Sequence, residues 1–242
     1  MDSECRGEKA QDEIDERSLA AHFQFGRNWQ NLMPQVDEAR VEAAVSDIAH
    51  FMPCKLTGLS FLDIGCGSGL SSLAAYRLGA SSIVSVDIDP LNVENVKQLK
   101  RMFAVPSEFP WVTKVASIVN PEEAAALPRS DLVYAWGVLH HTGDMWHAIQ
   151  ACGSLVSPGG YLYLMLYRDA WLAPMWRLIK GRYTGGGALV RFMLRNVFAA
   201  LLVTGMLLKA KNPLKVIDEY GKRSRGMSWY VDVTDWVGGY PF

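Results

Sequence analysis

The sequence has little cysteine and begins without an apolar run. Among 242 residues there are four cysteines, Cys5, Cys54, Cys66 and Cys152, and no CxxC pair. These exclude a disulfide framework and disfavour a structural zinc site. The first seventeen residues hold seven acids and three bases where a signal peptide needs apolar residues, so we expect a cytoplasmic protein. A chain of this length that is 50% apolar can bury a sufficient core without such crosslinks.

Net charge is also nearly absent, at −1, but the two signs are unevenly distributed. Residues 1–17 have a net charge of −4, from three bases and seven acids, and residues 18–166 also have −4, from nine bases and thirteen acids. Residues 167–242 have +7, from twelve bases and five acids. A basic segment can meet an anionic substrate, a membrane surface or nucleic acid, or it can form a solvated face that balances an acidic body.

From Ser60 onward, short apolar runs alternate with helical periods. Strands are predicted at 61–64, 82–87, 111–116, 131–136 and 161–167, and helices at 70–78, 91–103, 121–127 and 145–156, the last ending at a turn over 157–160. Such alternation predicts an α/β fold, a doubly wound, Rossmann-like parallel sheet with helices on both faces. Its ligand is expected at the carboxyl ends of the strands.

The predicted sheet divides the chain into four regions. We expect a disordered acidic tail over 1–17, helices over the cofactor cleft within 18–59 (at 18–29 and 37–51), a cofactor-binding core over 60–167, and a helical, basic substrate-side or lid region over 168–242.

The last region contains one apolar stretch, 197–208, flanked by Arg191, Arg195 and Lys209. Twelve residues are too few to span a bilayer, which needs ~20. We expect a helix that packs on the domain or covers its pocket, with peripheral membrane contact through 188–209 as the alternative.

The strongest motif follows the first predicted strand and reads Leu-Asp-Ile-Gly-Cys-Gly-Ser-Gly over 62–69. Glycines at alternate positions let the backbone approach a ligand and adopt positive φ, and the following helix offers free N–H groups. The alternative is a tight turn in a protein that binds something else. A dinucleotide fingerprint GxGxxG would need glycine at Leu70, so a pyrophosphate is not indicated.

Two acids define the ligand further. Asp63, before the glycines, would repel phosphate and attract an ammonium group. Asp87, at the end of the second strand, suits the hydroxyls of an unphosphorylated ribose, although it can also be an ordinary turn residue. A ligand with an amino group and a ribose diol but no phosphate describes S-adenosylmethionine.

With these motifs the sequence resembles the class I S-adenosylmethionine-dependent methyltransferases, in the group that includes the ubiquinone and menaquinone biosynthesis methylases. The resemblance covers about 61–167 and extends to VSVDIDP, DLVYAWGVLHHTGDM and SPGGYLYLMLY. It implies a methyl transfer to a small-molecule acceptor. The alternatives are a methyltransferase of RNA or protein, and a cofactor-binding scaffold without turnover.

The resemblance also implies cofactor-binding positions. The residues implied to hold the methionine end are Asp63, Gly65, Cys66, Gly67 and Gly69. The family binds the ribose through the position of Asp87, with Ile88 packing on the adenine. An acid usually follows the third strand to meet the adenine amino group; here that acid is missing, and Ser117 and Ile118 are the candidates. Trp136, at the end of the fourth strand, completes the predicted cofactor site.

Candidate catalytic residues follow the fourth strand. Transfer of a methyl from a sulfonium needs mainly alignment and desolvation, but an oxygen or nitrogen acceptor can also need a base. His141 is the first candidate and His140 the second; the alternative is that one packs under the cofactor while the other orients the loop. A metal site with His147 lacks a completing carboxylate or cysteine, so none is expected.

Three further residues are predicted on the substrate or lid side: Arg27, Trp29 and Tyr167. Helix packing is the alternative for the first two. An aromatic segment over 226–240 resembles a second substrate-side wall without assigned chemistry. Because only about fifteen residues follow the helical region, we expect the antiparallel strand pair that usually ends such sheets to be absent or incomplete. The sequence does not indicate an oligomeric state.

Overall fold

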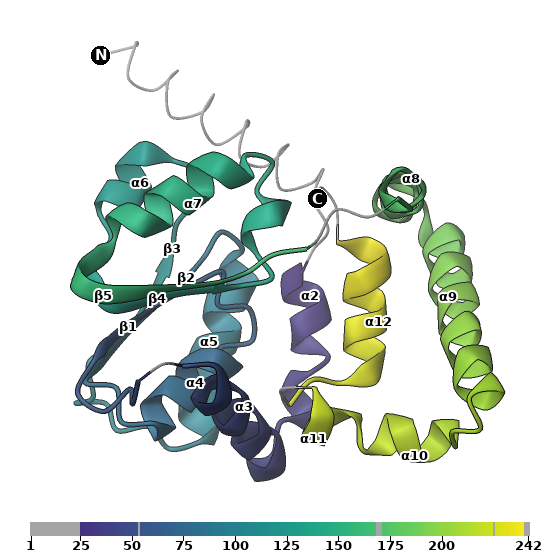
Figure 1. Ribbon diagram of the computed structural model, residues 1–242, viewed down its shortest axis with the longest axis horizontal. Helices are drawn as coiled ribbons and strands as arrows, with labels where there is room; N and C mark the ends of the chain where they lie inside the picture. Colours follow the sequence, from purple (N-terminus) through teal and green to yellow (C-terminus); the bar gives the residue numbers. More distant parts are fainter. Residues whose placement is uncertain (1–24, 53, 168–170, 225, 240–242) are drawn as a thin grey trace, which may run out of the picture.

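The computed structural model describes residues 25–52, 54–167, 171–224 and 226–239 (Figure 1). The predicted acidic tail and the first part of the helix predicted at 18–29 lie outside these ranges.

Five strands form one parallel sheet. They are β1 (Ser60–Ile64), β2 (Ser82–Asp87), β3 (Trp111–Val115), β4 (Ser130–Trp136) and β5 (Val156–Met165). Their order is β3-β2-β1-β4-β5, and all four neighbouring pairs are parallel. The order reverses between β1 and β4, which is where ligands bind in open α/β sheets. The predicted doubly wound fold class is confirmed.

Helices cover both faces of this sheet. The helices α3 (Glu38–Phe51), α4 (Leu70–Arg77) and α5 (Pro90–Met102) lie on one face, and α6 (Pro121–Ala125) and α7 (Met145–Ser154) lie on the other (Figure 1). Because alternate strand residues face opposite sides, Phe61 joins the core under α3–α5 and Leu62 joins the core under α6–α7. Side chains of Asp37, Asp89, Asn120 and Asp144 cap α3, α5, α6 and α7.

The largest difference from the predicted strand boundaries is at the start of the fifth strand. Residues 157–160, predicted as a turn before the fifth strand, lie within β5, where Val156 pairs with Ser130 and Tyr161 with Leu132. Four residues of β5 therefore oppose one residue of β4 as a bulge. Gly159 has φ +80°, and a Cβ on Gly160 would lie 2.6 Å from the carbonyl oxygen of Asp131. Glycines allow this irregularity without ending the strand.

The described chain after β5 forms helices. They are α8 (Ala173–Gly185), α9 (Ala188–Leu208), α10 (Pro213–Asp218), α11 (Tyr220–Arg223) and α12 (Trp229–Gly238). In Figure 1, α12 stands between the sheet and α9, which lies at the far edge of the molecule. The described residues here include no antiparallel strand pair, and the expected incomplete edge stays a prediction.

Helix α9 is longer than predicted. It has 21 residues where a twelve-residue apolar stretch was expected, because the apolar pattern continues past Arg191 and Arg195 on the outer side of the helix. By length and composition alone it could cross a membrane, with a mean hydropathy of 1.5 over its most apolar window and none of that window buried. One side of α9 lines the cavity, as expected for a helix that covers the pocket, whereas its other side is exposed.

A short helix, α2 (Phe25–Gln30), joins the two parts of the molecule. The carboxylate of Asp89, at the start of α5, accepts a hydrogen bond from the Gly26 backbone N–H at 3.0 Å. On the other side, the Asn28 amide donates to the Val231 carbonyl oxygen at 2.9 Å and to Asp235 Oδ1 at 2.6 Å, both on α12. Together with a 3₁₀ turn at Met33–Gln35, this helix connects the sheet to the C-terminal helices.

Candidate functional site

A cavity of about 1230 Å³ opens at the carboxyl ends of the strands and continues to α9. Its lining includes most of the predicted site residues: Arg27, Trp29, Asp63, Gly65, Cys66, Gly67, Asp87, Ile88, Ser117, Ile118, Trp136, His141 and Tyr167. Gly69 and His140 are predicted site residues that do not line it. Residues from segments far apart in the sequence thus share one space.

The glycine motif forms the loop between β1 and α4. Gly65, Gly67 and Gly69 all have positive φ, at +69°, +53° and +81°. A Cβ on Gly65 would collide with Val138, and one on Gly67 would lie 3.2 Å from the Trp29 ring. Gly69 begins α4, and its Cβ would lie 2.8 Å from Val96. Gly69 therefore shapes the loop, while Gly65 and Gly67 bring the backbone to the cavity.

Asp87 holds this loop in place. Its Oδ2 accepts a hydrogen bond from the Gly67 N–H at 3.0 Å, and its Oδ1 accepts one from the Asp89 N–H at 2.9 Å. Burial raises the pKa of this carboxyl, and the two backbone donors and a hydrogen bond from the Asn92 side chain oppose the shift. A carboxylate offers about four acceptor positions, so a ligand hydroxyl can still bind here.

Asn92, on the first turn of α5, is a cavity residue that the sequence analysis missed. It is 2% exposed, and its Oδ1 has no hydrogen-bond partner among the described residues. A buried polar atom without a partner is costly, so a ligand donor at this position would satisfy it. Its spacing of five residues after Asp87 was the available signal.

Asp63 is the second buried acid of the cavity. Desolvation raises its pKa to about 7, assisted by the nearby charge of Asp87 and opposed by a hydrogen bond from Ser72. The Ser72 hydroxyl lies 2.5 Å from Asp63 Oδ2 and 2.7 Å from the Ser85 hydroxyl, which accepts a hydrogen bond from Trp111 Nε1 at 2.8 Å. A polar chain across three strands therefore supports this carboxyl.

The same two acids affect Cys66 on the loop between them. Burial, followed by the charges of Asp87 and Asp63, raises the pKa of its thiol well above the ordinary value. Cys66 therefore lines the cavity as a neutral, apolar contact.

The loop after β3 contains an acid contributed from elsewhere. Glu123, on α6, accepts a hydrogen bond from the Ser117 backbone N–H at 2.6 Å and one from the Asn120 amide at 2.9 Å. The Ser117 N–H is therefore already used. The Ser117 hydroxyl and the backbone of Ile118 remain as the polar groups that this loop presents to the cavity.

Of the two candidate histidines, the structure places His141 in the cavity wall and His140 behind it. His140 is 8% exposed, and neither ring nitrogen has a hydrogen-bond partner among the described residues. Desolvation, then the charges of His141 and Lys180, lowers its pKa to about 3. Its ring centre lies 3.9 Å from that of Tyr167 and 4.2 Å from that of His141. This geometry favours a packing role for His140.

The wall opposite the sheet comes from the C-terminal helices. Its lining side chains from α8, α9 and α12 are mainly apolar or aromatic: Trp176, Phe198, Leu202, Met206, Trp229, Val233 and Trp236. Trp229 and Trp236 belong to the aromatic segment over 226–240 that was predicted on the substrate side without assigned chemistry. The helical spacing of these aromatic residues is visible in the sequence, but their packing opposite α9 is not, because α9 is distant in sequence.

Two ionisable groups, Lys180 and Asp235, interact at this wall, and Asp235 itself lines the cavity. Lys180 on α8 is 2% exposed, and its Nζ lies 5.4 Å from the Tyr167 ring centre and 5.6 Å from that of Trp236. Desolvation lowers the pKa of Lys180 to about 8, while the charge of Asp235 raises it. Desolvation also raises the pKa of Asp235 well above its usual range, against the hydrogen bond from Asn28. These groups position the aromatic side of the cavity.

Within residues 25–52, 54–167, 171–224 and 226–239, no group of three or more His, Cys, Asp or Glu side chains is arranged to hold a metal ion. The arrangement instead fits an organic ligand. It combines close backbone approach, two buried carboxyls and a large apolar wall.

Comparison with known proteins adds a family match. The family model described as "Methyltransferase domain" matches residues 36–201. A ubiquinone biosynthesis O-methyltransferase from Methylocella silvestris is 34% identical over 124 residues, covering 51% of this chain and 45% of the relative. Another, from Xanthomonas campestris pv. campestris, is 39% identical over 110 residues, covering 45% and 43%. The chain therefore spans less than half the length of these curated relatives.

Among solved structures, an S-adenosylmethionine-dependent methyltransferase from Mesorhizobium loti aligns with a TM-score of 0.42 and 23% identity, covering 50% of this chain and 52% of that one.

Proposed function

The chain belongs to the methyltransferase-domain family, and on this basis we propose that it transfers a methyl group from S-adenosylmethionine to a small-molecule acceptor. The observation that carries the proposal is the single cavity with two chemically different ends. One end has glycine backbone and the buried carboxyls of Asp63 and Asp87; the other has mainly aromatic and apolar side chains, with Asp232 and Asp235 among them. At about 1230 Å³ the cavity exceeds the ~300–1,000 Å³ of most ligand pockets, which leaves room for a cofactor and an acceptor together.

The polar end suits the cofactor. Asp63 would attract the ammonium group of its methionine part, and Asp87 would accept hydrogen bonds from its ribose hydroxyls. Asn92 Oδ1 would accept a further hydrogen bond there. The bound cofactor supplies an electrophilic methyl group on a sulfonium sulfur. When the methyl is transferred, the sulfur leaves as a neutral thioether, which needs no proton from an acid. The protein's contribution is therefore to orient the reactants and exclude water.

The aromatic end suits the acceptor. His141 lies where the cavity passes from the strand ends to the C-terminal helices, with its ring centre 5.3 Å from that of Phe25 and 5.5 Å from that of Tyr167. We assign His141 the role of taking the proton from an acceptor hydroxyl, since a neutral imidazole nitrogen can act as a general base. The relatives named O-methyltransferases support oxygen as the acceptor atom.

Two measurements test this function. Isothermal titration is expected to detect binding of S-adenosylmethionine and of S-adenosylhomocysteine, and absence of both would refute the cofactor assignment. A screen of hydroxylated small molecules, read as S-adenosylhomocysteine formation, is expected to find turnover. Cofactor binding without turnover on any acceptor would favour a scaffold that retains the fold.

The role of His141 needs its own comparison. His141→Ala is expected to lower kcat by about 10²–10⁴-fold and to leave cofactor binding unchanged. His147→Ala is the matched control, because His147 is exposed on α7 and does not line the cavity. Equal kcat for both variants would remove the base assignment.

A further inference from the structure

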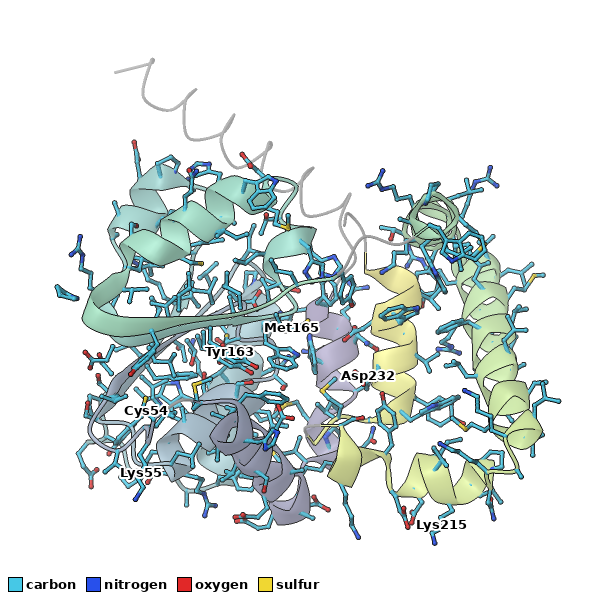
Figure 2. All side chains as sticks on the ribbon, viewed as in Figure 1. Cys54, Lys55, Tyr163, Met165, Lys215 and Asp232 are labelled. Carbon is cyan, nitrogen blue, oxygen red and sulfur yellow. The ribbon has the colours of Figure 1, made fainter. Side chains whose placement is uncertain are left out.

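Helix α9 has a face that carries no charge and points away from the rest of the molecule. We call it the α9 outer face, and its apolar members are Leu189, Val190, Met193, Val197, Ala200, Leu201, Leu207 and Leu208. They recur at helical spacing and are strongly exposed, for example 64% for Leu201 and 84% for Leu208. Side chains project from this side of α9 in Figure 2. An exposed apolar surface of this kind marks an interaction site.

The opposite side of α9 belongs to the protein. Phe198, Leu202 and Met206 line the cavity, and α9 contacts both α8 and α12. At its start, the Arg191 guanidinium donates hydrogen bonds to the carbonyl oxygens of Tyr183 and Thr184 at 3.2 and 2.9 Å. The helix therefore has a fixed orientation, with one face inward and the outer face free of charge.

The charge around α9 identifies the chemistry of a partner. Residues 171–217 contain eight Lys or Arg and no Asp or Glu. Exposed bases flank the helix: Arg182 precedes it, and Lys209, Lys211 and Lys215 follow it. Lys215 is labelled on α10, beyond the end of α9, in Figure 2. An apolar helical face bounded by bases is typical of a helix that lies in the interface of an anionic bilayer.

The packing distinguishes lying on a bilayer from crossing it. The 21 residues of α9 span about 32 Å, enough to cross. However, α8 precedes α9, α12 follows it, and α8 and α12 contact each other directly. A crossing α9 would begin and end on opposite sides of the membrane and would separate these two helices. Both ends of α9 must therefore stay on one side.

We propose that the α9 outer face docks on the anionic surface of a lipid bilayer, with its apolar side chains in the interface and Lys209, Lys211 and Lys215 over the headgroups. This proposal goes beyond methyl transfer and does not depend on it. It also implies that the cavity wall formed by Phe198, Leu202 and Met206 lies one helix thickness from the lipid.

Vesicle sedimentation of the whole chain tests the proposal. Binding is expected to vesicles of phosphatidylcholine mixed with phosphatidylglycerol, to weaken with added salt, and to be much weaker with phosphatidylcholine alone. Leu201→Glu is expected to weaken the partition at least about tenfold, since it removes one buried leucine and adds a negative charge. Met102→Glu, an exposed apolar residue at the end of α5, is the matched control and is expected to bind as the wild type does.

The basic residues give a second, milder variant. Lys209→Gln combined with Lys211→Gln is expected to weaken binding to the anionic vesicles by about fivefold for each base removed. Thermal unfolding of every variant, followed by circular dichroism, is expected to be unchanged. That measurement shows that the variants fold without relying on cofactor binding, so failure of this proposal is separate from failure of the proposed function.

Four results would overturn the docking proposal. The first is equal vesicle binding by Leu201→Glu and Met102→Glu, and the second is vesicle-bound protein that resists extraction by alkaline carbonate, which would indicate a crossing helix. The third is a dimer that Leu201→Glu dissociates, in a protein that does not bind vesicles. The fourth is salt-dependent binding of single-stranded RNA that the double lysine variant weakens, again in a protein that does not bind vesicles.

Discussion

The sheet region and the C-terminal helical region place their apolar residues differently. From β1 to β5, core side chains such as Phe61, Leu62 and Leu132 are at most 1% exposed, in two clusters that fill both faces of the sheet. In α9, of similar apolar content, no residue is buried. The sheet region stabilises itself by burial. Among the C-terminal helices, α12 buries Val231 and Val237, whereas α9 offers its apolar surface to the cavity and to the exterior.

The two regions are connected by apolar packing, in which Met227 and Val231 join the core cluster under α3–α5, and by a few polar contacts. Besides the Asn28 contacts with α12, the Arg40 guanidinium donates to the carbonyl oxygens of Gly226 and Met227 at 2.7 and 2.6 Å. We therefore expect substitutions in the glycine loop to change stability and cofactor binding together, and substitutions at the connections to affect mainly the helical region.

The largest effect is expected for Gly65→Ala. The new Cβ would collide with Val138, and alanine at a φ of +69° costs a further 1–2 kcal/mol, so the free energy of unfolding should fall by about 3 kcal/mol in urea titrations. Gly143→Ala is the control, because Gly143 has φ +81° but no atom within 4 Å of its Cβ position. If both variants lost the same stability, the close approach of Val138 would have no energetic importance.

Asp87→Ala is expected to weaken S-adenosylmethionine binding by about 10–100-fold. The variant loses the acceptor of the Gly67 N–H and the proposed acceptor of the ribose hydroxyls, and hydrogen bonds to charged groups contribute about 1.5–3 kcal/mol. Isothermal titration measures the change. Glu94→Ala, on the exposed side of α5, provides the comparison. Unchanged affinity in Asp87→Ala would remove the ribose assignment.

The raised pKa of Asp63 leads us to expect that both the folding stability of the ligand-free protein and its affinity for the cofactor depend on pH. The unfolded chain loses this proton near 3.8 and the folded chain near 7, so this group's contribution to folding stability falls as the pH rises between these values and is constant above.

A cationic ligand prefers the ionised carboxylate. Cofactor affinity should therefore rise up to tenfold per pH unit below about 7 and level off above it. Titrations across this range measure the effect, and Asp63→Asn should bind weakly without this pH dependence. A wild-type affinity that is constant through pH 7 would contradict the assignment.

The smallest effect is expected for Asn28→Ala, which removes two hydrogen bonds to α12. Stability should fall by about 1 kcal/mol for each bond lost. Hydrogen exchange should accelerate in α8–α12 and stay unchanged in β1–β5. Gln35→Ala, which removes only an exposed local contact with the Asn31 carbonyl, is the control. Uniform acceleration over both regions would show that they unfold as one unit.

The sequence predicts the sheet region well because its signals are local. The motif over 62–69 combines a strand end, glycines and a helix start within eight residues, and positive φ at Gly65, Gly67 and Gly69 follows from sterics alone. The spacing to Asp87 marks the end of the neighbouring strand. Parallel pairing then places both acids at one cavity, as expected for the carboxyl ends of a sheet.

The remaining features depend on contacts between distant segments. No local pattern indicates that Glu123 occupies the Ser117 N–H, or that Tyr167 packs on His140 and directs only His141 to the cavity. The length of α9 was missed because Arg191 and Arg195 read as flanks in sequence, whereas in three dimensions they lie off the outer face. Apolar spacing alone did not predict which side of that helix would face the cavity.

Helix α2 has a consequence for how two ligands would influence each other. It is hydrogen-bonded to Asp89, two residues beyond Asp87, and to Asp235 in the aromatic wall. A ligand bound near Asp87 that orders α2 lowers the entropy cost for a second ligand that binds at the aromatic wall and also needs α2 ordered. Binding at the two ends is then expected to be cooperative, and linkage requires each ligand to raise the affinity of the other by the same factor.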